Sequence, residues 1–177
     1  MRILSLSFLL VLGCVPVRSR SEAECAPPAD GNARAIPLDT LIGLAGRYRM
    51  TSVTTAPGYD RSPVLRDLKL TVADTLQRYY EQGLRGPRRT GNRPLVGSLG
   101  QEPVVVQQNP GNTQMISGFC TMCTDAEFIY HTIVQVRPNG FIGRWHDPQT
   151  GIGRVVDSKG HELPDPKGYF CALRTSD

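Results

Sequence analysis

Residues 66–80 read RDLKLTVADTLQRYY, and the alternation within this stretch decides the fold class. From Leu68 to Val72 every second residue is apolar, and the residues between them are polar. A period of two is typical of a half-buried antiparallel strand, because successive side chains of a strand point to opposite faces. The stretch therefore predicts a strand with one face toward a core.

Similar patterns recur along most of the chain. Further strands are predicted over residues 46–55, 95–99, 104–108, 113–118, 127–136, 141–146, 152–156 and 168–174. Helical character is confined to residues 37–45 (PLDTLIGLA), where we expect one or two turns with Asp39 as the N-cap and Gly46 as the stop.

Turn residues indicate how these strands pair. Residues 137–140 (RPNG) place Pro at the second turn position and Gly where a positive φ is needed, which predicts a hairpin. Residues 147–151 (DPQTG) and 157–160 (DSKG) predict two more turns. We therefore expect an all-β protein, an antiparallel meander of about eight strands closed into a barrel, because closure removes unpaired sheet edges. A β-sandwich is the alternative.

The composition excludes several classes of protein. With 177 residues, 40% hydrophobic and 20% charged, the chain has the size and balance of a single globular domain and not of a disordered one. The net charge is only +4 and the basic residues are spread along the chain, so no nucleic-acid partner is expected. The polar face of the 66–80 strand argues against a membrane-spanning barrel.

Residues 1–19 have the form of an export signal. Arg2 precedes an apolar run over residues 3–12, which is too short to span a bilayer. Two cuts are open: a lipobox-type cut before Cys14, which would be acylated, or an ordinary cut after Ser19. Residues 20–36 are predicted to form a flexible polar lead and residues 37–177 a single barrel domain. The expected location is the bacterial cell envelope, lipid-anchored on its periplasmic face, or the secreted fraction.

Five cysteines are present, and Cys14 is not available for a disulfide on either route, because it is acylated in one and cut off in the other. Cys25, Cys120, Cys123 and Cys171 remain, and four cysteines in an oxidising compartment predict two disulfides. All three connectivities are open. We expect Cys25 and Cys171 each to pair with one member of Cys120 and Cys123, which would tie both chain ends to the middle of the barrel. A metal or redox pair at the Cys-x-x-Cys motif is the alternative.

No catalytic constellation is found. His131 lies mid-strand, where an interior histidine is expected, whereas His146 and His161 lie at strand ends. No Gly-x-Ser-x-Gly elbow is present to indicate a nucleophile. We therefore expect no catalytic residue, no metal ligand and no cofactor.

One cluster of basic residues stands out, in residues 83–93 (GLRGPRRTGNR). Its members are Arg85, Arg88, Arg89 and Arg93. Because the segment is rich in Gly and Pro, it predicts a long exposed loop, and arginine loops bind phosphate or anionic lipid headgroups. A solvated loop tip without a ligand is the alternative.

Residues 44–49 (LAGRYR) place a helical turn before Gly-x-aromatic at the start of the first strand. This arrangement resembles the opening of lipocalin-like barrels, where Gly-x-Trp closes the barrel floor. Tyr48 stands here in place of Trp, and the helix that normally follows the last strand is missing. The resemblance covers the order of elements over residues 37–175 and implies a cup for a small apolar ligand. The lining expected for such a cup is Tyr48, Met50, Leu70, Val72, Tyr130 and Trp145.

Together these features lead us to expect a non-enzymatic, exported, monomeric barrel that binds a small apolar ligand. The alternative is a structural, interaction or inhibitor-type module with a packed barrel, whose loops contact an envelope protein.

Overall fold

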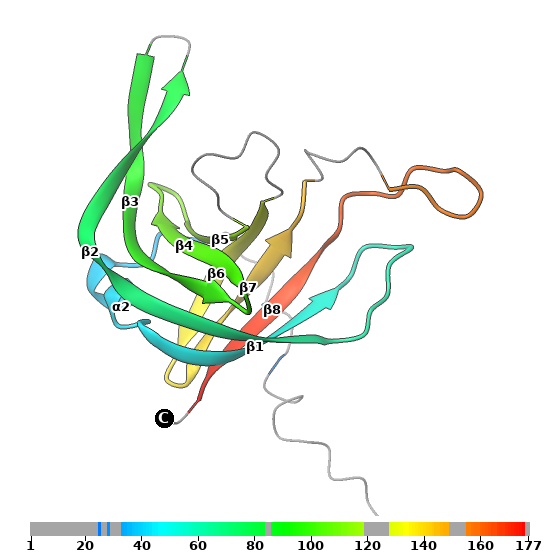
Figure 1. Ribbon diagram of the computed structural model, residues 1–177, viewed down its shortest axis with the longest axis horizontal. Coiled ribbons are helices and arrows are strands. Elements are labelled where there is room, and N and C mark those ends of the chain that lie inside the picture. Colours follow the sequence, from blue (N-terminus) through cyan, green and yellow to red (C-terminus); the bar gives the residue numbers. More distant parts are fainter. Residues whose placement is uncertain are drawn as a thin grey trace, which may run out of the picture.

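Eight antiparallel strands form a closed barrel in which each strand pairs with the next along the chain and the last pairs with the first (Figure 1). The strands are β1 (Gly46–Thr54), β2 (Val64–Gly83), β3 (Gly86–Leu99), β4 (Glu102–Gln108), β5 (Thr113–Ser117), β6 (Ile129–Arg137), β7 (Gly140–His146) and β8 (Lys167–Arg174). The computed structural model describes Cys25, Pro28 and residues 33–83, 86–118, 128–148 and 155–175, and for residues 75–91 the backbone alone. The predicted all-β barrel is confirmed, and the sandwich alternative is wrong because the sheet closes on itself.

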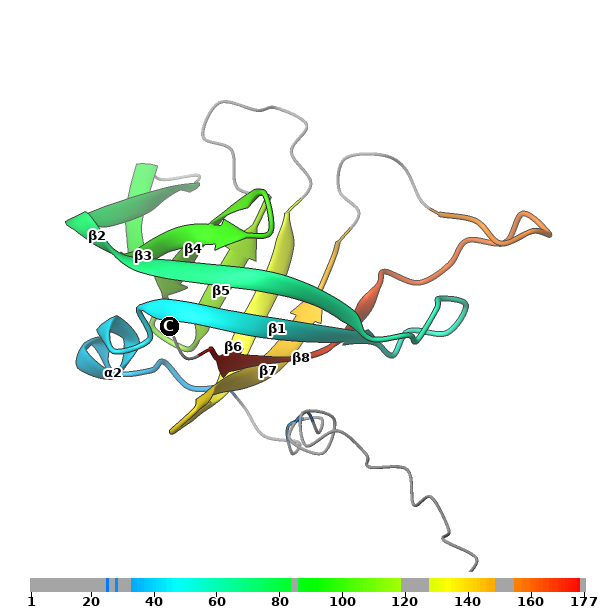
Figure 2. The same ribbon diagram turned by 60° about the horizontal axis from the view of Figure 1, so that its bottom comes forward.

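The short helix α2 (Leu38–Ile42) lies at one end of the barrel, which we call the closed end (Figure 2). At the opposite end, which we call the open end, β1, β3, β5 and β7 finish and β2, β4, β6 and β8 begin. The N-cap of the helix is Pro37 and not Asp39, because the Pro37 carbonyl accepts the first helical hydrogen bond, from the Leu41 amide. It stops at Gly43, earlier than the predicted Gly46.

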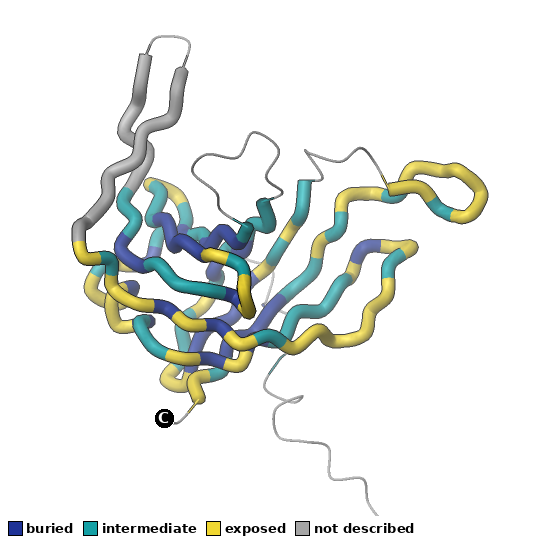
Figure 3. Tube along the Cα trace, in the orientation of Figure 1, coloured by how far each residue is buried: buried dark blue, intermediate teal, exposed yellow. Residues whose placement is uncertain are grey.

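The barrel interior holds a continuous apolar core, seen as the dark blue parts of the strands in Figure 3. Its buried members are Ile36, Leu41, Leu44, Tyr48, Met50, Leu68, Leu70, Leu95, Leu99, Val104, Val106, Met115, Ile133, Phe141, Phe170 and Ala172. Where a strand contributes two of these residues they are two apart, or four apart in β3, so the alternation seen in the sequence is the inside–outside alternation of the barrel wall. Leu41 and Leu44 extend the core from the closed end.

The turn between β6 and β7 forms as its residues predict. Arg137 pairs with Gly140 across a two-residue turn. Gly140 has a φ of 148°, and a side chain there would overlap the carbonyl oxygen of Ala172 on β8. Glycine is therefore needed at this position both for the turn and for the close approach of β8.

The predicted exposed loop over residues 83–93 is wrong. The backbone instead continues β2 to Gly83 and resumes in β3 at Gly86, and the two strands stay paired to the tip. Pro87 is tolerated because β4 does not pair with this part of β3, which leaves the proline on an edge where no ladder donor is needed. Gly and Pro in this segment therefore mark an isolated two-stranded ribbon and not a loop.

The predicted strand over residues 152–156 is not found as a barrel strand. Residues 151–154 lie outside the described part of the chain, and Val156 makes only an isolated bridge with Glu162, around the predicted turn at residues 157–160. Among the described residues no helix has the length and apolarity needed to cross a bilayer.

Candidate ligand site in the barrel

The closed end is sealed by aromatic packing and by one arginine. The Tyr48 and Phe141 rings meet edge to face at 5.2 Å, and the Tyr48 hydroxyl donates to the Leu44 carbonyl at 2.7 Å. The Arg174 guanidinium lies 5.4 Å from the Tyr48 ring centre and donates to the carbonyl oxygens of Gly43 and Ala45 at 2.9 and 3.2 Å. Because Arg174 ends β8, this contact fastens the last strand to the segment that precedes the first.

Polar side chains enter the interior wall nearer the open end. Ser117 ends β5 opposite Val104 of β4, and His131 of β6 lies opposite Met115 of β5. Ser117 is fully buried and His131 is 3% exposed. Since Met115 is a core residue and Ser117 follows it by two positions, Ser117 and His131 belong to the same interior face of neighbouring strands.

Two atoms of these side chains, Ser117 Oγ and His131 Nδ1, are buried without a hydrogen-bond partner among the residues that the structure describes. An unsatisfied buried polar group costs roughly 1–3 kcal/mol, and such groups are rare in folded proteins. The His131 ring is also held edge to face against Phe170 at 5.4 Å. The two orphaned atoms are therefore fixed in an otherwise apolar wall.

The pKa of His131 is lowered from 6.5 to about 4, mainly because burial disfavours the charged ring and to a smaller extent because of interactions with Arg66 and His146. The backbone of Met115 and Ile129 acts in the opposite direction and is outweighed. His131 is consequently neutral at pH 7. A neutral imidazole has one nitrogen that donates and one that accepts, so it can meet a polar uncharged group of either kind.

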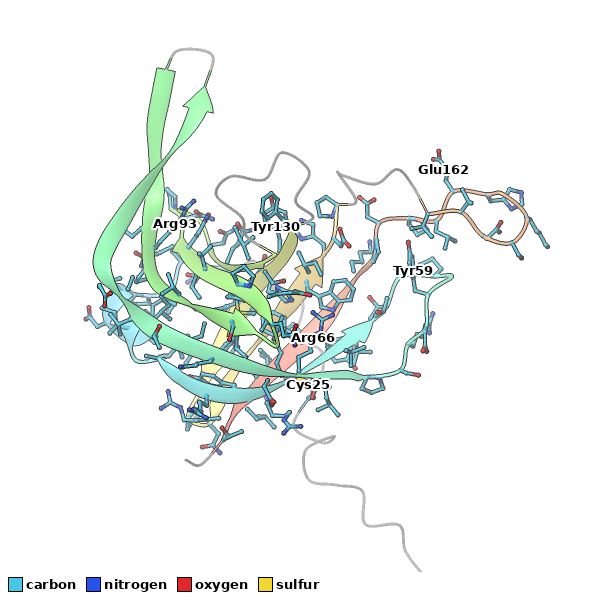
Figure 4. The ribbon with its side chains drawn as sticks, viewed as in Figure 1. Cys25, Tyr59, Arg66, Arg93, Tyr130 and Glu162 are labelled. Atoms are coloured by element: carbon cyan, nitrogen blue, oxygen red, sulfur yellow. A yellow bond between two sulfur atoms is a disulfide. The ribbon has the colours of Figure 1, made fainter. Side chains whose placement is uncertain are left out.

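An ion pair lies farther toward the open end. Arg66 Nη1 on β2 contacts both carboxylate oxygens of Glu102 on β4 at 3.3 Å, across the intervening strand β3. Arg66 precedes the buried Leu68 by two residues, and Glu102 precedes the buried Val104 by two, so both belong to the interior face. Figure 4 shows Arg66 together with Tyr59 and Glu162, which lie on two loops of the open end. The two side chains are 40% and 45% exposed, and such a pair contributes little to stability.

The predicted lining residues do not form one site. Tyr48, Met50 and Leu70 are buried within the core near the closed end. Trp145 is half-buried, and its indole nitrogen donates to the Val53 carbonyl at 3.2 Å. Tyr130, paired with His146, alternates with the buried His131 and so belongs to the outer face, where its ring stacks on His146 at 5.1 Å.

Val72 also differs from its expected place, because its side chain is 46% exposed. The pairing of β2 with β3 is irregular immediately after Val72, and β1 pairs with β2 only as far as Leu70. Val72 thus follows the alternation of its strand but lies at the limit of the barrel, where no opposite wall covers it.

The predicted disulfide connectivity is wrong: Cys25 and Cys171 pair with each other. Cys171 lies between the interior residues Phe170 and Ala172, so it lies on the outer side of β8, where Cys25 meets it (Figure 4). Cys14, Cys120 and Cys123 lie outside the described residues, as does Arg85. The spacing of the cysteines in the sequence could not reveal that Cys25 lies against the outer side of β8.

A hollow of about 350 Å³ lies at the ends of β6, β7 and β8. Its lining includes Pro28, Arg144, His146, Lys167 and Tyr169. Among the described residues no three His, Cys, Asp or Glu side chains gather closely enough to hold a metal ion. The remaining histidine, His161, contacts Asp157 at 3.1 Å in the turn after Val156.

The sequence interpretation missed Ser117, Arg66 and Glu102. Arg66 begins the alternating face of Leu68 and Leu70, so a polar residue at a core position of a strand was the available clue there. Residues 113–117 (TQMIS) do not alternate, because Met115 and Ile116 are both apolar, and they give no comparable signal for Ser117.

Comparison of this chain with protein families, with curated proteins and with solved structures finds no match. The function is accordingly inferred from the geometry of the barrel itself.

Proposed function

We propose that this protein is an exported barrel of the cell envelope that binds one small, mainly apolar ligand in the open-end half of its interior. The observation that carries the proposal is the pair of buried, unpartnered atoms Ser117 Oγ and His131 Nδ1 in an apolar wall. A ligand with a hydroxyl or amide group would give both atoms a partner, and apolar residues such as Val104, Met115 and Phe170 would cover the rest of it.

Two further observations support the proposal. The closed end is sealed where Gly46-x-Tyr48 begins β1, so a ligand would enter from the open end. The Cys25–Cys171 disulfide is consistent with an oxidising compartment, and hence with export. On this proposal a chain acylated at Cys14 would be held at a membrane, and one cut after Ser19 would be soluble.

A second function is favoured by exposed apolar side chains toward the open end. Val64 and Leu65 at the start of β2 are 49% and 60% exposed, and Val155 and Val156 are about half exposed. Exposed apolar patches mark contact surfaces in many proteins. An interaction module whose open-end loops contact an envelope protein would use these residues and would need no ligand in the barrel.

Titration with N-phenyl-1-naphthylamine, an apolar fluorescent probe with one N–H donor, separates the two functions. Ligand binding predicts saturation at one probe per chain. The single N–H of the probe can donate to only one of the two atoms, so the loss of that hydrogen bond should weaken binding about tenfold in at least one of Ser117→Ala and His131→Phe. Ser98→Ala and His146→Phe are matched controls on the outer wall and should bind as the wild type does.

Two results would reject the ligand site. The first is the absence of saturable binding, which would indicate a filled barrel and favour the interaction module. The second is equal affinity in all four variants, which would place the probe elsewhere. The fluorescence of Trp145, the single tryptophan, gives an independent signal on the same samples.

A further inference from the structure

Beyond the barrel wall, β2 and β3 continue as a two-stranded ribbon, which we call the arm and define as residues 77–83 and 86–93. β1 pairs with β2 only as far as Leu70, and β4 pairs with β3 only from Asn92 onward. The arm strands therefore pair almost entirely with each other, from Gln77 with Arg93 to Gly83 with Gly86. Figure 1 shows the arm projecting away from the barrel.

The arm carries most of the net charge of the protein. Its strands contain four arginines, Arg78, Arg88, Arg89 and Arg93, and one acidic residue, Glu81. Counted with Arg85, which lies between the two strands in the sequence, residues 77–93 have a net charge of +4, equal to the net charge of the whole chain. The rest of the protein is thus balanced in charge, and attraction to a polyanion would be concentrated on the arm.

The register of the arm sorts these charges between its two faces. A register shift after Tyr79 places Arg89, and not Thr90, opposite Tyr80. Bulges of this kind redirect side chains to the other face of a strand. Because positions two apart share a face, Arg78, Tyr80 and Arg89 lie on one face, while Arg88 and Glu81, opposite each other in the register, lie on the other. The first face is basic, with an aromatic residue and without a carboxylate.

We propose that this face of the arm binds the phosphate groups of an anionic phospholipid surface. Arginine recognises phosphate with paired donors, and tyrosine is enriched at the level of lipid headgroups. The choice of a membrane over a nucleic acid rests on the envelope location in the proposed function, although the ligand site itself is not involved. A basic patch also supplies the second attachment that a lipid-anchored protein needs for stable membrane binding.

The test is sedimentation of the purified protein with phosphatidylcholine vesicles that contain or lack phosphatidylglycerol. The readout is the difference between the two vesicles, so that any acyl chain at Cys14, which inserts into both, cancels. The double variant R78Q/R89Q should lose at least about tenfold of the anionic-specific affinity. The control R47Q/R61Q removes the same charge from exposed positions outside the arm and should lose less than about twofold.

Three outcomes would overturn the proposal. They are equal losses in both double variants, equal binding of the wild type to both vesicles, and tighter binding to a short DNA duplex than to anionic vesicles at the same salt concentration. Probe binding in the barrel, measured on the same samples, should be unchanged by R78Q/R89Q. A failure of the arm is therefore distinguishable from a failure of the ligand site.

Discussion

At the scale of single residues, Ser117 and His131 connect the stability of the barrel with its proposed function. Each buries a polar atom that has no partner in the described part of the chain, so each costs stability in the ligand-free protein. Sites of function commonly retain such local conflicts because a ligand resolves them. The conflict therefore gives two predictions, one for each residue.

Ser117→Ala should stabilise the ligand-free protein by about 1 kcal/mol, because it removes a buried hydroxyl that lacks a partner and leaves only a small gap. Urea denaturation of the wild type and the variant measures the change in the free energy of unfolding. Ser98→Ala on the outer wall should change it by less than about 0.5 kcal/mol. A loss of stability in Ser117→Ala would mean that the hydroxyl is satisfied in solution.

Stability should depend on pH through His131. Its pKa is about 4 in the folded protein and near 6.5 when unfolded, so between these values the unfolded chain binds more protons. The neutral ring's contribution is thus complete above pH 6.5 and decreases as the pH falls toward 4, by up to about 1.4 kcal/mol per pH unit. Denaturation between pH 4 and 7 should show this slope reduced in His131→Phe. An unchanged slope in that variant would contradict a buried neutral His131.

At the scale of elements, alternation predicted the strands well and turn residues predicted them unevenly. The alternation in residues 66–80 predicts a strand because the inner face of the barrel wall is apolar and the outer face is solvated, which imposes a period of two. Residues 83–93 were misread because a ribbon outside the barrel has no core face, and its Gly and Pro meet no packing constraint. The position of Val72 was missed for a related reason, because a pattern does not show where the opposite wall ends.

Arg174 is the contact that joins elements at the closed end. Its guanidinium donates to Gly43, Ala45 and the Tyr48 hydroxyl, so Arg174→Gln should lower the free energy of unfolding by about 1–2 kcal/mol. Hydrogen exchange should quicken mainly in residues 38–45. Arg47→Gln, an exposed arginine of β1, is the control and should have little effect. Similar losses of unfolding free energy in both variants would show a general effect of removing a positive charge and not the loss of the specific Arg174 hydrogen bonds.

At the scale of the whole molecule, the barrel and the Cys25–Cys171 disulfide constrain the two ends of the chain. The sequence predicted that these cysteines form disulfides but not which ones pair. The pairing depends on which strand carries an outward-facing cysteine next to Cys25. Export, the lipid at Cys14 and the monomeric state stay predictions. The ligand site likewise could not be assembled from sequence, since Ser117 and His131 become neighbours only when β5 pairs with β6.

The double variant Cys25→Ala, Cys171→Ala should lower the free energy of unfolding by roughly 3–5 kcal/mol, because the bridge spans 146 residues and restricts the unfolded chain strongly. Guanidinium denaturation measures the loss. Peptide mapping of the unreduced wild type should recover Cys25 linked to Cys171. Recovery of either cysteine linked to Cys120 or Cys123 would contradict the observed pairing.

The central claim is that a ligand inside the barrel meets Ser117 and His131. A long-range proton–nitrogen spectrum of the three histidine rings, recorded with and without saturating N-phenyl-1-naphthylamine, tests it most directly, with His131→Phe assigning the His131 signals. The Nδ1 resonance of His131 should shift on binding, while those of His146 and His161 stay unchanged. Saturable binding that leaves the His131 resonance in place would contradict the claim.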